Sequence, residues 1–113
     1  MKSKIKDIVN ASFKKIVSWR EHIHAHPELS FQEVNTSAYV ASILKEMDIP
    51  YKHGIAGTGV VALIKGLNPE KRCVALRADM DALPIHEEND VIYKSKKQGV
   101  MHACGHDVHT ACL

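Results

Sequence analysis

Apolar residues recur at three- and four-residue steps in the first part of the chain, which is the pattern of an amphipathic helix. The stripe consists of Ile5, Ile8, Val9, Phe13, Ile16 and Val17. We expect this helix to run to His24 or His26, because Pro27 disfavours helical geometry in the residue before it. A second stripe predicts a second helix, which closes at Asp48-Ile49-Pro50; its residues are Val40, Ile43, Leu44 and Met47.

The start of the second helix carries a capping signal. Ser30 and Glu33 have the spacing of a capping box, in which the two side chains satisfy the free amides of the first turn. We therefore expect the second helix to begin at Ser30.

After Pro50 the pattern changes to short apolar runs between turn residues, which is typical of strands. We predict strands at residues 59–64 and 71–77, joined as a hairpin through the Gly and Asn-Pro of residues 65–70. Residues 78–84 would then be a loop at a strand end, where open α/β sheets tend to place their chemistry. The polar stretch 86–98 is predicted to be exposed.

The last segment, residues 108–113, predicts the beginning of a third helix, and no C-cap signal follows it. Two helices and a few strands could make a small domain. We expect the chain to be a truncated part of a longer domain, because the predicted strands would need further helices to cover them.

The composition is that of an ordinary soluble globular chain, with 45% hydrophobic and 25% charged residues. The 15 basic and 13 acidic residues are spread along the chain, so no basic block indicates nucleic acid or a membrane surface as a partner. No apolar run approaches the roughly 18 residues of a membrane span. Three cysteines argue against a disulfide framework and for a reducing compartment, so we expect a cytoplasmic location.

The most specific chemistry lies between residues 101 and 109. Cys104 and His106 are two residues apart and can face one cation of the zinc or late first-row type. Asp107 could support such ligands, or it could be the N-cap of the following helix. The alternative interpretation is that Cys104 is a small packing residue and the histidines are ordinary surface or core residues.

Asp79 and Asp81 form the second candidate cluster. Two carboxylates at the end of a buried strand are costly unless a positive group, such as a metal ion or its imidazole ligand, lies nearby. The alternative is a solvated turn, in which aspartates are common.

The other histidines and cysteines receive no chemical role. The alternating positions of His22, His24 and His26 place their rings on different faces of a helix, so we do not expect them to share an ion. Four further residues are expected in packing positions (Cys73 and Cys112) or in loops (His53 and His86).

Three collinear segments carry a family resemblance: residues 19–33 with His24-Ala-His26-Pro27-Glu28-Leu29-Ser30-Phe31, residues 77–85 with Asp79-Met80-Asp81-Ala82-Leu83-Pro84, and residues 101–111 with His102-Ala103-Cys104-Gly105-His106-Asp107. They closely resemble the M20 amidohydrolases of the group that contains hippurate hydrolase, the indole-acetyl-amino-acid hydrolases and N-acetyldiaminopimelate deacetylase. The match extends from about Trp19 to the end of the chain.

The resemblance implies an α/β catalytic domain, with helices packed on a mixed sheet, that a smaller lid or dimerisation domain interrupts. Residues 1–113 would be the amino-terminal portion of the catalytic domain, without the lid domain or the rest of the catalytic domain. The implied activity is hydrolysis of the linear amide of small N-acyl amino acids at two divalent ions, zinc or manganese, with cobalt or nickel as further candidates. A homodimer or homo-oligomer is expected for the full-length form, and neither nucleic acid nor membrane is expected as a partner.

The resemblance also assigns roles. Cys104 and His106 match the first two metal ligands, and Asp81 matches the catalytic aspartate that orients and polarises the metal site. Asp79, Asp107 and His109 are expected beside the ligands, without direct contact with metal. In this family the glutamate that acts as a base, a metal-binding glutamate and two further histidine ligands come later in the chain, so we expect these 113 residues alone to be inactive.

Two other functions remain open at this point. A small non-catalytic module could use His102, Cys104, His106 and His109 to bind one structural zinc ion. Alternatively, Cys104 could act as a thiol nucleophile that a neighbouring histidine activates, although nothing in the sequence supplies an oxyanion hole.

Overall fold

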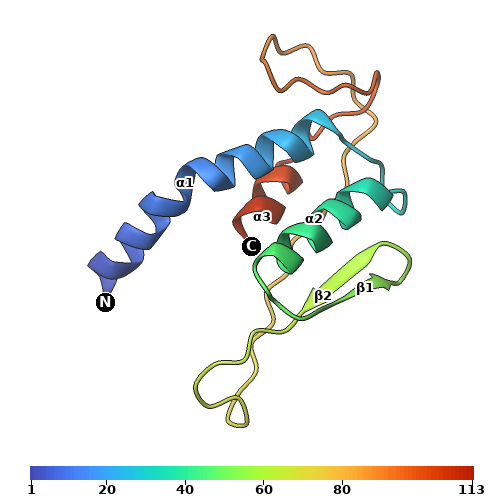
Figure 1. Ribbon diagram of the computed structural model, residues 1–113. Coiled ribbons are helices and arrows are strands. Elements are labelled where there is room, and N and C mark those ends of the chain that lie inside the picture. Colours follow the sequence, from blue (N-terminus) through green and yellow to red (C-terminus); the bar gives the residue numbers. More distant parts are fainter.

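The computed structural model describes residues 1–113 and contains three helices and one two-stranded sheet. Along the chain the elements are α1 (Lys2–Ala25), α2 (Val34–Glu46), β1 (Tyr51–Ile55), β2 (Gly59–Ala62) and α3 (His106–Cys112). Helix α3 packs against α1, and α2 packs against both strands (Figure 1). The α/β class predicted from the sequence is therefore confirmed.

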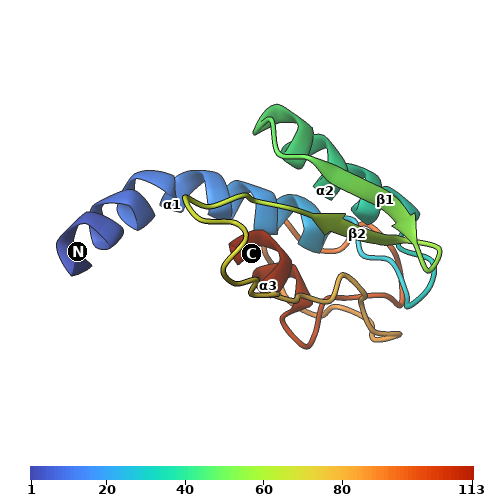
Figure 2. The same cartoon turned by 90° about the horizontal axis from the view of Figure 1, so that it is seen from below.

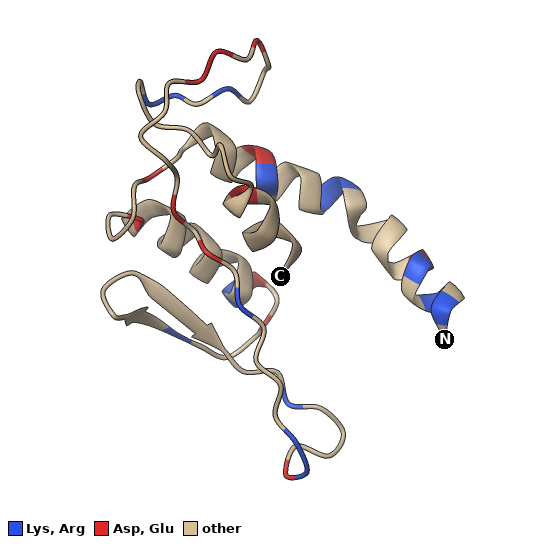
Figure 3. Ribbon diagram, turned by 180° about the vertical axis from the view of Figure 1, so that it is seen from behind, with Lys and Arg blue, Asp and Glu red and all other residues tan.

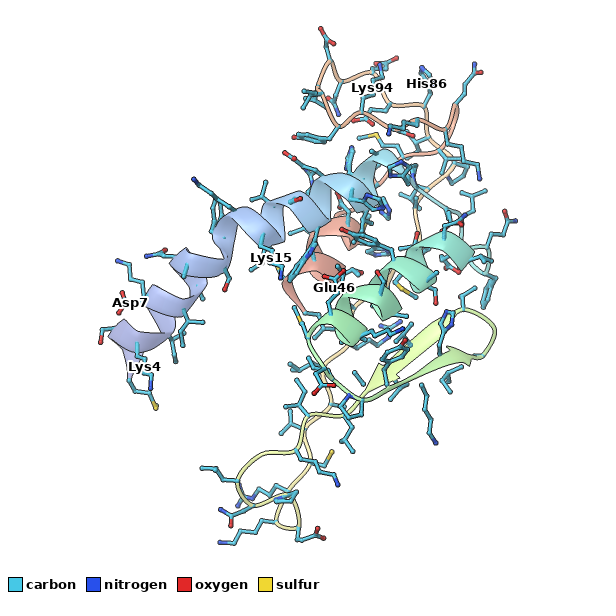
Figure 4. All side chains as sticks on the ribbon, in the orientation of Figure 1. Lys4, Asp7, Lys15, Glu46, His86 and Lys94 are labelled. Atoms are coloured by element: carbon cyan, nitrogen blue, oxygen red, sulfur yellow. The ribbon has the colours of Figure 1, made fainter.

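Helix α1 has the extent that its apolar stripe predicts and ends at Ala25, two residues before Pro27. Its amino-terminal half projects away from the other elements, as the view from below shows (Figure 2), and Lys4 and Asp7 mark this projecting end (Figure 4). The stripe is consequently uncovered there, and the side chain of Phe13 is 61% exposed.

The second helix begins four residues later than predicted, and the capping box is wrong. Glu33 occupies the N-cap position without a side-chain cap, and Ser30 lies in an exposed turn. The carboxylate of Glu28 caps the helix instead, because it accepts hydrogen bonds from the backbone amides of Asn35 (3.1 Å) and Thr36 (2.6 Å). Burial would raise the pKa of Glu28, but these bonds and those from both side chains lower it.

The predicted hairpin between residues 59–64 and 71–77 is wrong. Strand β2 pairs antiparallel with β1, which precedes it, and the register places Tyr51 opposite Ala62. The turn brings the two strands so close that a Cβ at Gly59 would lie 2.6 Å from the carbonyl oxygen of Ile55. Residues 71–77 are exposed and pair with no other strand, although their apolar pattern is typical of a strand.

Polar contacts join α2 to the hairpin. Ser37 is fully buried, and its hydroxyl donates to the carbonyl of Thr58 and lies 2.7 Å from His53 Nε2. The Thr58 hydroxyl donates to Glu33 at 2.8 Å. His53, which we expected in a loop without a role, is thus a strand residue that contributes to this contact.

Few residues are buried, and most of the buried apolar residues are alanines. The buried apolar residues are Ile23, Ala25, Ala41, Ala82, Val100 and Ala111. Cys73, Cys104 and Cys112 are all exposed free thiols, so the packing roles predicted for Cys73 and Cys112 are wrong. Lys and Arg positions are interspersed with Asp and Glu positions along the ribbon (Figure 3). None of the helices is both long and apolar enough to span a membrane.

The cap of α2 gives a first prediction. Replacing Glu28 with alanine should lower the free energy of unfolding by about 1 kcal/mol, because two amides of the first turn lose their acceptor. Urea unfolding followed by circular dichroism measures this change. Ser30→Ala is the matched control and should leave the free energy of unfolding unchanged. An equal loss of stability in both variants would instead support the capping box that the sequence predicted.

Candidate functional site

Short backbone contacts place the Asp79–Asp81 loop beside the Cys104 segment. Leu83 forms an isolated antiparallel bridge with Met101, with N···O distances of 2.9 and 3.0 Å. On the other side the amide of Ala82 donates to the carbonyl of Glu28 at 2.7 Å. The loop that carries Asp81 therefore lies between the segment after α1 and the segment before α3, although no regular strand precedes it.

His106 and Asp81 are in direct contact. His106 Nδ1 lies 2.9 Å from Asp81 Oδ1 and 3.0 Å from the Asp81 carbonyl oxygen, and both side chains are partly exposed. Since both oxygens accept, Nδ1 must carry the proton, and the neutral ring then has a free lone pair on Nε2. A histidine that binds a metal through one nitrogen usually donates its other N–H to a carboxylate or carbonyl in this way.

Helix α3 begins at His106, two residues earlier than predicted. Gly105 precedes it with a φ of 104°, a left-handed conformation that a residue with a Cβ rarely adopts, and its carbonyl accepts from the amides of Val108 and His109. His106 is thereby the first residue of the helix and lies next to the turn that contains Cys104.

Asp107 is not an N-cap, because Gly105 occupies that position. The side chain of Asp107 is fully buried against α1, where Oδ2 accepts from Arg20 Nε (2.8 Å) and lies 2.7 Å from His24 Nδ1. Burial would raise the pKa of Asp107, but the hydrogen bond to His24 and the charge of Arg20 lower it below its usual range. The carboxylate therefore points away from Asp81 and joins two helices.

Glu87 overturns the prediction that residues 86–98 are exposed throughout. Its side chain is only 2% exposed and accepts from the amide of Ser95 (2.6 Å), His24 Nε2 (3.0 Å) and Asn89 Nδ2 (3.2 Å). Burial would raise the pKa of Glu87, but these hydrogen bonds lower it to about 2. His86 and Lys94, labelled in Figure 4, lie in the rest of this loop.

The other candidate residues form no hydrogen bond with the side chain of His106 or Asp81. The Asp79 carboxylate lies 2.6 Å from Arg77, a solvent-accessible ion pair that contributes little to stability, while its carbonyl accepts from the Thr110 hydroxyl at 2.7 Å. Cys104 is exposed. His109 is exposed too, and its ring centroid lies 5.9 Å from that of His106.

The four residues of the zinc-module alternative do not converge. His102 is buried, neither of its ring nitrogens has a hydrogen-bond partner, and burial lowers its pKa. No group of three or more His, Cys, Asp or Glu side chains is arranged to hold a metal ion. The structure therefore gives no support to a four-residue zinc module, and Cys104 and His106 remain the candidate pair.

The first histidine cluster has a role that the sequence did not indicate. His24 is buried between Asp107 and Glu87, whereas His22 and His26 are exposed on the opposite side, with ring centroids 4.6 Å apart. The prediction that all three rings point to different faces is wrong for His22 and His26, since residues four apart share a helix face. Only the spacing of Arg20 and His24 by four residues could have suggested a shared partner.

Comparison with known proteins identifies relatives of this chain. Residues 75–113 match the model of peptidase family M20/M25/M40. The N-acyl-L-amino acid amidohydrolase of Geobacillus stearothermophilus is 50% identical over 99% of this chain and 30% of its own length. Thermostable carboxypeptidase 1 of Saccharolobus solfataricus is 49% identical over 97% of this chain and 28% of its own length.

A solved structure, the Bacillus subtilis YXEP protein, described as a dinuclear metal binding peptidase from the M20 family, superimposes with a TM-score of 0.81. It is 43% identical, over 90% of this chain and 29% of that chain. Fold and sequence together define the class: an α/β chain that matches the amino-terminal region of M20 metallopeptidases. This chain belongs to the M20 family, and it spans less than a third of the length of these relatives.

The buried carboxyl of Glu87 predicts a pH dependence. Its pKa is about 2 in the folded chain against an ordinary 4.5, so its contribution to stability is present above 4.5 and is lost as the pH falls from 4.5 toward 2. Urea midpoints measured across this range should fall less steeply in Glu87→Gln than in the unsubstituted chain. The exposed neighbour provides the control: Glu88→Gln should keep the original slope, and a Glu87→Gln slope equal to it would contradict the assignment.

Proposed function

We propose that this chain contributes Cys104 and His106 to a two-metal centre of a hydrolase that cleaves the linear amide of small N-acyl amino acids. The names of the relatives support the reaction type and the number of metals: one is an N-acyl-L-amino acid amidohydrolase, and the solved M20 peptidase is described as dinuclear. Zinc or manganese, with cobalt or nickel as further candidates, are the metals that the family resemblance implies, and of these a thiolate with an imidazole suits zinc well.

One observation carries the proposal, namely the hydrogen bond between His106 and Asp81. With Nδ1 bound to Asp81, the His106 ring is fixed in orientation and presents Nε2 as a ligand. The Asp81 carboxylate also makes this nitrogen a stronger electron donor, because the hydrogen bond supports positive charge on the ring. Asp81 thus acts through His106.

The remaining residues have supporting roles. Cys104 offers an exposed sulfur two residues from His106, and thiolate and imidazole together suit zinc and similar ions. Metal ions at this position would lower the pKa of a water molecule and polarise the amide carbonyl. Asp107 and Asp79 anchor α3, through Arg20 and through Thr110 respectively, so that His106 keeps its place. His109 is proposed at the rim beside His106.

The proposal extends to the organisation of a longer protein. Residues 1–113 would form the amino-terminal portion of a catalytic domain, and the base and the remaining ligands would come from the part of the relatives that this chain does not span. The chain alone would then be inactive, since two protein ligands leave most of a coordination sphere to water. A cytoplasmic, homo-oligomeric enzyme remains our expectation for the longer form.

Replacing the proposed sulfur ligand should abolish metal-dependent hydrolysis. In the protein continued as in its relatives, Cys104→Ala should lower kcat/KM for an N-acyl amino acid by at least about 100-fold and reduce the metal content measured by elemental analysis. Cys73→Ala, which removes another exposed thiol, should change neither quantity. Full activity in Cys104→Ala would end the proposal.

Asp81 should affect the metal less than a direct ligand does. In the protein continued as in its relatives, we expect Asp81→Asn to weaken metal binding by about 10- to 100-fold. The reason is that the asparagine amide oxygen accepts a weaker hydrogen bond from His106 than a carboxylate does and carries no negative charge. Isothermal titration with Zn²⁺ or Mn²⁺ measures this affinity. The exposed Asp90→Asn serves as the control, and equal affinities in the two variants would exclude the role of Asp81.

The 113-residue chain itself distinguishes the enzyme from the zinc module. Zinc titration should show weak binding without a gain in helix content, because no three ligands converge. Tight one-to-one binding coupled to folding, and lost in both His102→Ala and His109→Ala, would favour the structural module over the metallohydrolase.

A further inference from the structure

Four charged side chains form a buried network outside the proposed metal ligands. Arg20 and His24 come from the same face of α1, Glu87 comes from the loop 86–98, and Asp107 comes from the first turn of α3. His24 and Asp107 are 83 positions apart in the sequence. The side chains of His24, Glu87 and Asp107 are nearly inaccessible to solvent, so each charge needs a partner of opposite sign.

The hydrogen bonds determine the protonation state of His24. Its Nδ1 lies 2.7 Å from Asp107 Oδ2 and its Nε2 lies 3.0 Å from Glu87 Oε1. An ionised carboxylate only accepts, so both ring nitrogens must donate, and the ring is an imidazolium. Arg20 Nη2 also lies 3.3 Å from His24 Nδ1 and could donate to it if Nδ1 carried no proton. In that case, however, Nδ1 and Asp107 Oδ2 would be two acceptors only 2.7 Å apart. The shorter contact therefore assigns the proton to Nδ1.

With His24 as a cation, the network contains two positive and two negative groups and is neutral as a whole. The Tyr93 ring borders the network: its centroid lies 4.8 Å from the Arg20 guanidinium and 5.4 Å from the centroid of the His24 ring, which is edge-on to it. The amide of Lys96 donates to the carbonyl of Ala25 at 2.9 Å, which attaches the loop to the end of α1. The two ring nitrogens of His24 contact one carboxylate of the loop and one carboxylate of α3.

The network continues directly to the candidate metal site. Asp107 follows His106 in α3, and successive helical residues point about 100° apart. Holding Asp107 against α1 therefore sets the rotation of α3 that directs His106 toward Asp81. A short helix of seven residues has little stability of its own, so its orientation depends on side-chain contacts such as that of Asp107 with α1.

We propose that His24 is a positioning residue: as an imidazolium between Glu87 and Asp107, it orients α3 so that His106 keeps Nδ1 on Asp81 and Nε2 free for a metal ion. This inference rests on the proposed function, in which His106 is a ligand. A buried ion network that served stability alone could be replaced without effect on His106, so stability measurements do not test the proposal.

The first test needs no metal. Long-range ¹H–¹⁵N spectra of the labelled 113-residue chain at pH 7 report which ring nitrogens carry protons. We expect both nitrogens of His24 to be protonated and His106 to have its proton on Nδ1. In His24→Gln, His106 should become a mixture of tautomers, whereas the matched control on the same helix, His22→Gln, should leave His106 unchanged.

The second test uses Co²⁺, whose charge-transfer absorption reports binding to the Cys104 thiolate. In the protein continued as in its relatives, His24→Gln should weaken Co²⁺ binding by about 10- to 100-fold, and His22→Gln should bind like the unsubstituted protein. If His24→Gln does not fold, as judged by amide spectra, Glu87→Gln replaces it and should shift the His106 tautomers in the same direction.

The outcomes separate the two hypotheses. An unchanged His106 tautomer and unchanged Co²⁺ affinity in folded His24→Gln would overturn the positioning role and leave the proposed function intact. A singly protonated His24 in the unsubstituted chain would also overturn it. Absence of any thiolate band in the unsubstituted longer protein would instead defeat the proposed function, whatever the histidine spectra show.

Discussion

The buried carboxylate of Asp107 is the constraint on which the arrangement of this chain depends. Transferring a carboxylate into the interior is costly unless cations and hydrogen-bond donors accompany it. Arg20 and His24 meet that requirement from α1, so α3 can pack only where its first turn reaches these two side chains. The placement of His106 beside Asp81 is a consequence of this docking.

Polar contacts have the same function elsewhere in the molecule. Glu28 caps α2, Ser37 joins α2 to the hairpin, and Glu87 holds the loop 86–98 against α1. Hydrogen bonds of this kind specify orientation, because they require donors and acceptors at defined distances and angles. The buried apolar side chains are few, and much of the α1 stripe is exposed, so directional contacts rather than a large apolar core determine how these elements are placed.

Two of the predictions that failed share one cause. Residues 71–77 have the composition of a strand, yet a strand exists only where another backbone pairs with it, and β2 pairs with β1 instead. Ser30 and Glu33 have the spacing of a capping box, yet Glu28 reaches the same amides from outside the helix. In both cases local spacing was correct for the motif, and a competing contact from another segment prevailed.

By itself the sequence determined the helical stripes of α1 and α2, the α/β class, the family and the segments that carry the candidate ligands, because these follow from local periodicity and from residue types in a fixed order. Only the tertiary structure decided that His24 lies between Glu87 and Asp107, that Asp107 faces α1, and that His106 bonds to Asp81 through Nδ1. These contacts join residues 25 to 83 positions apart, and the pairing of such distant groups depends on how the elements pack.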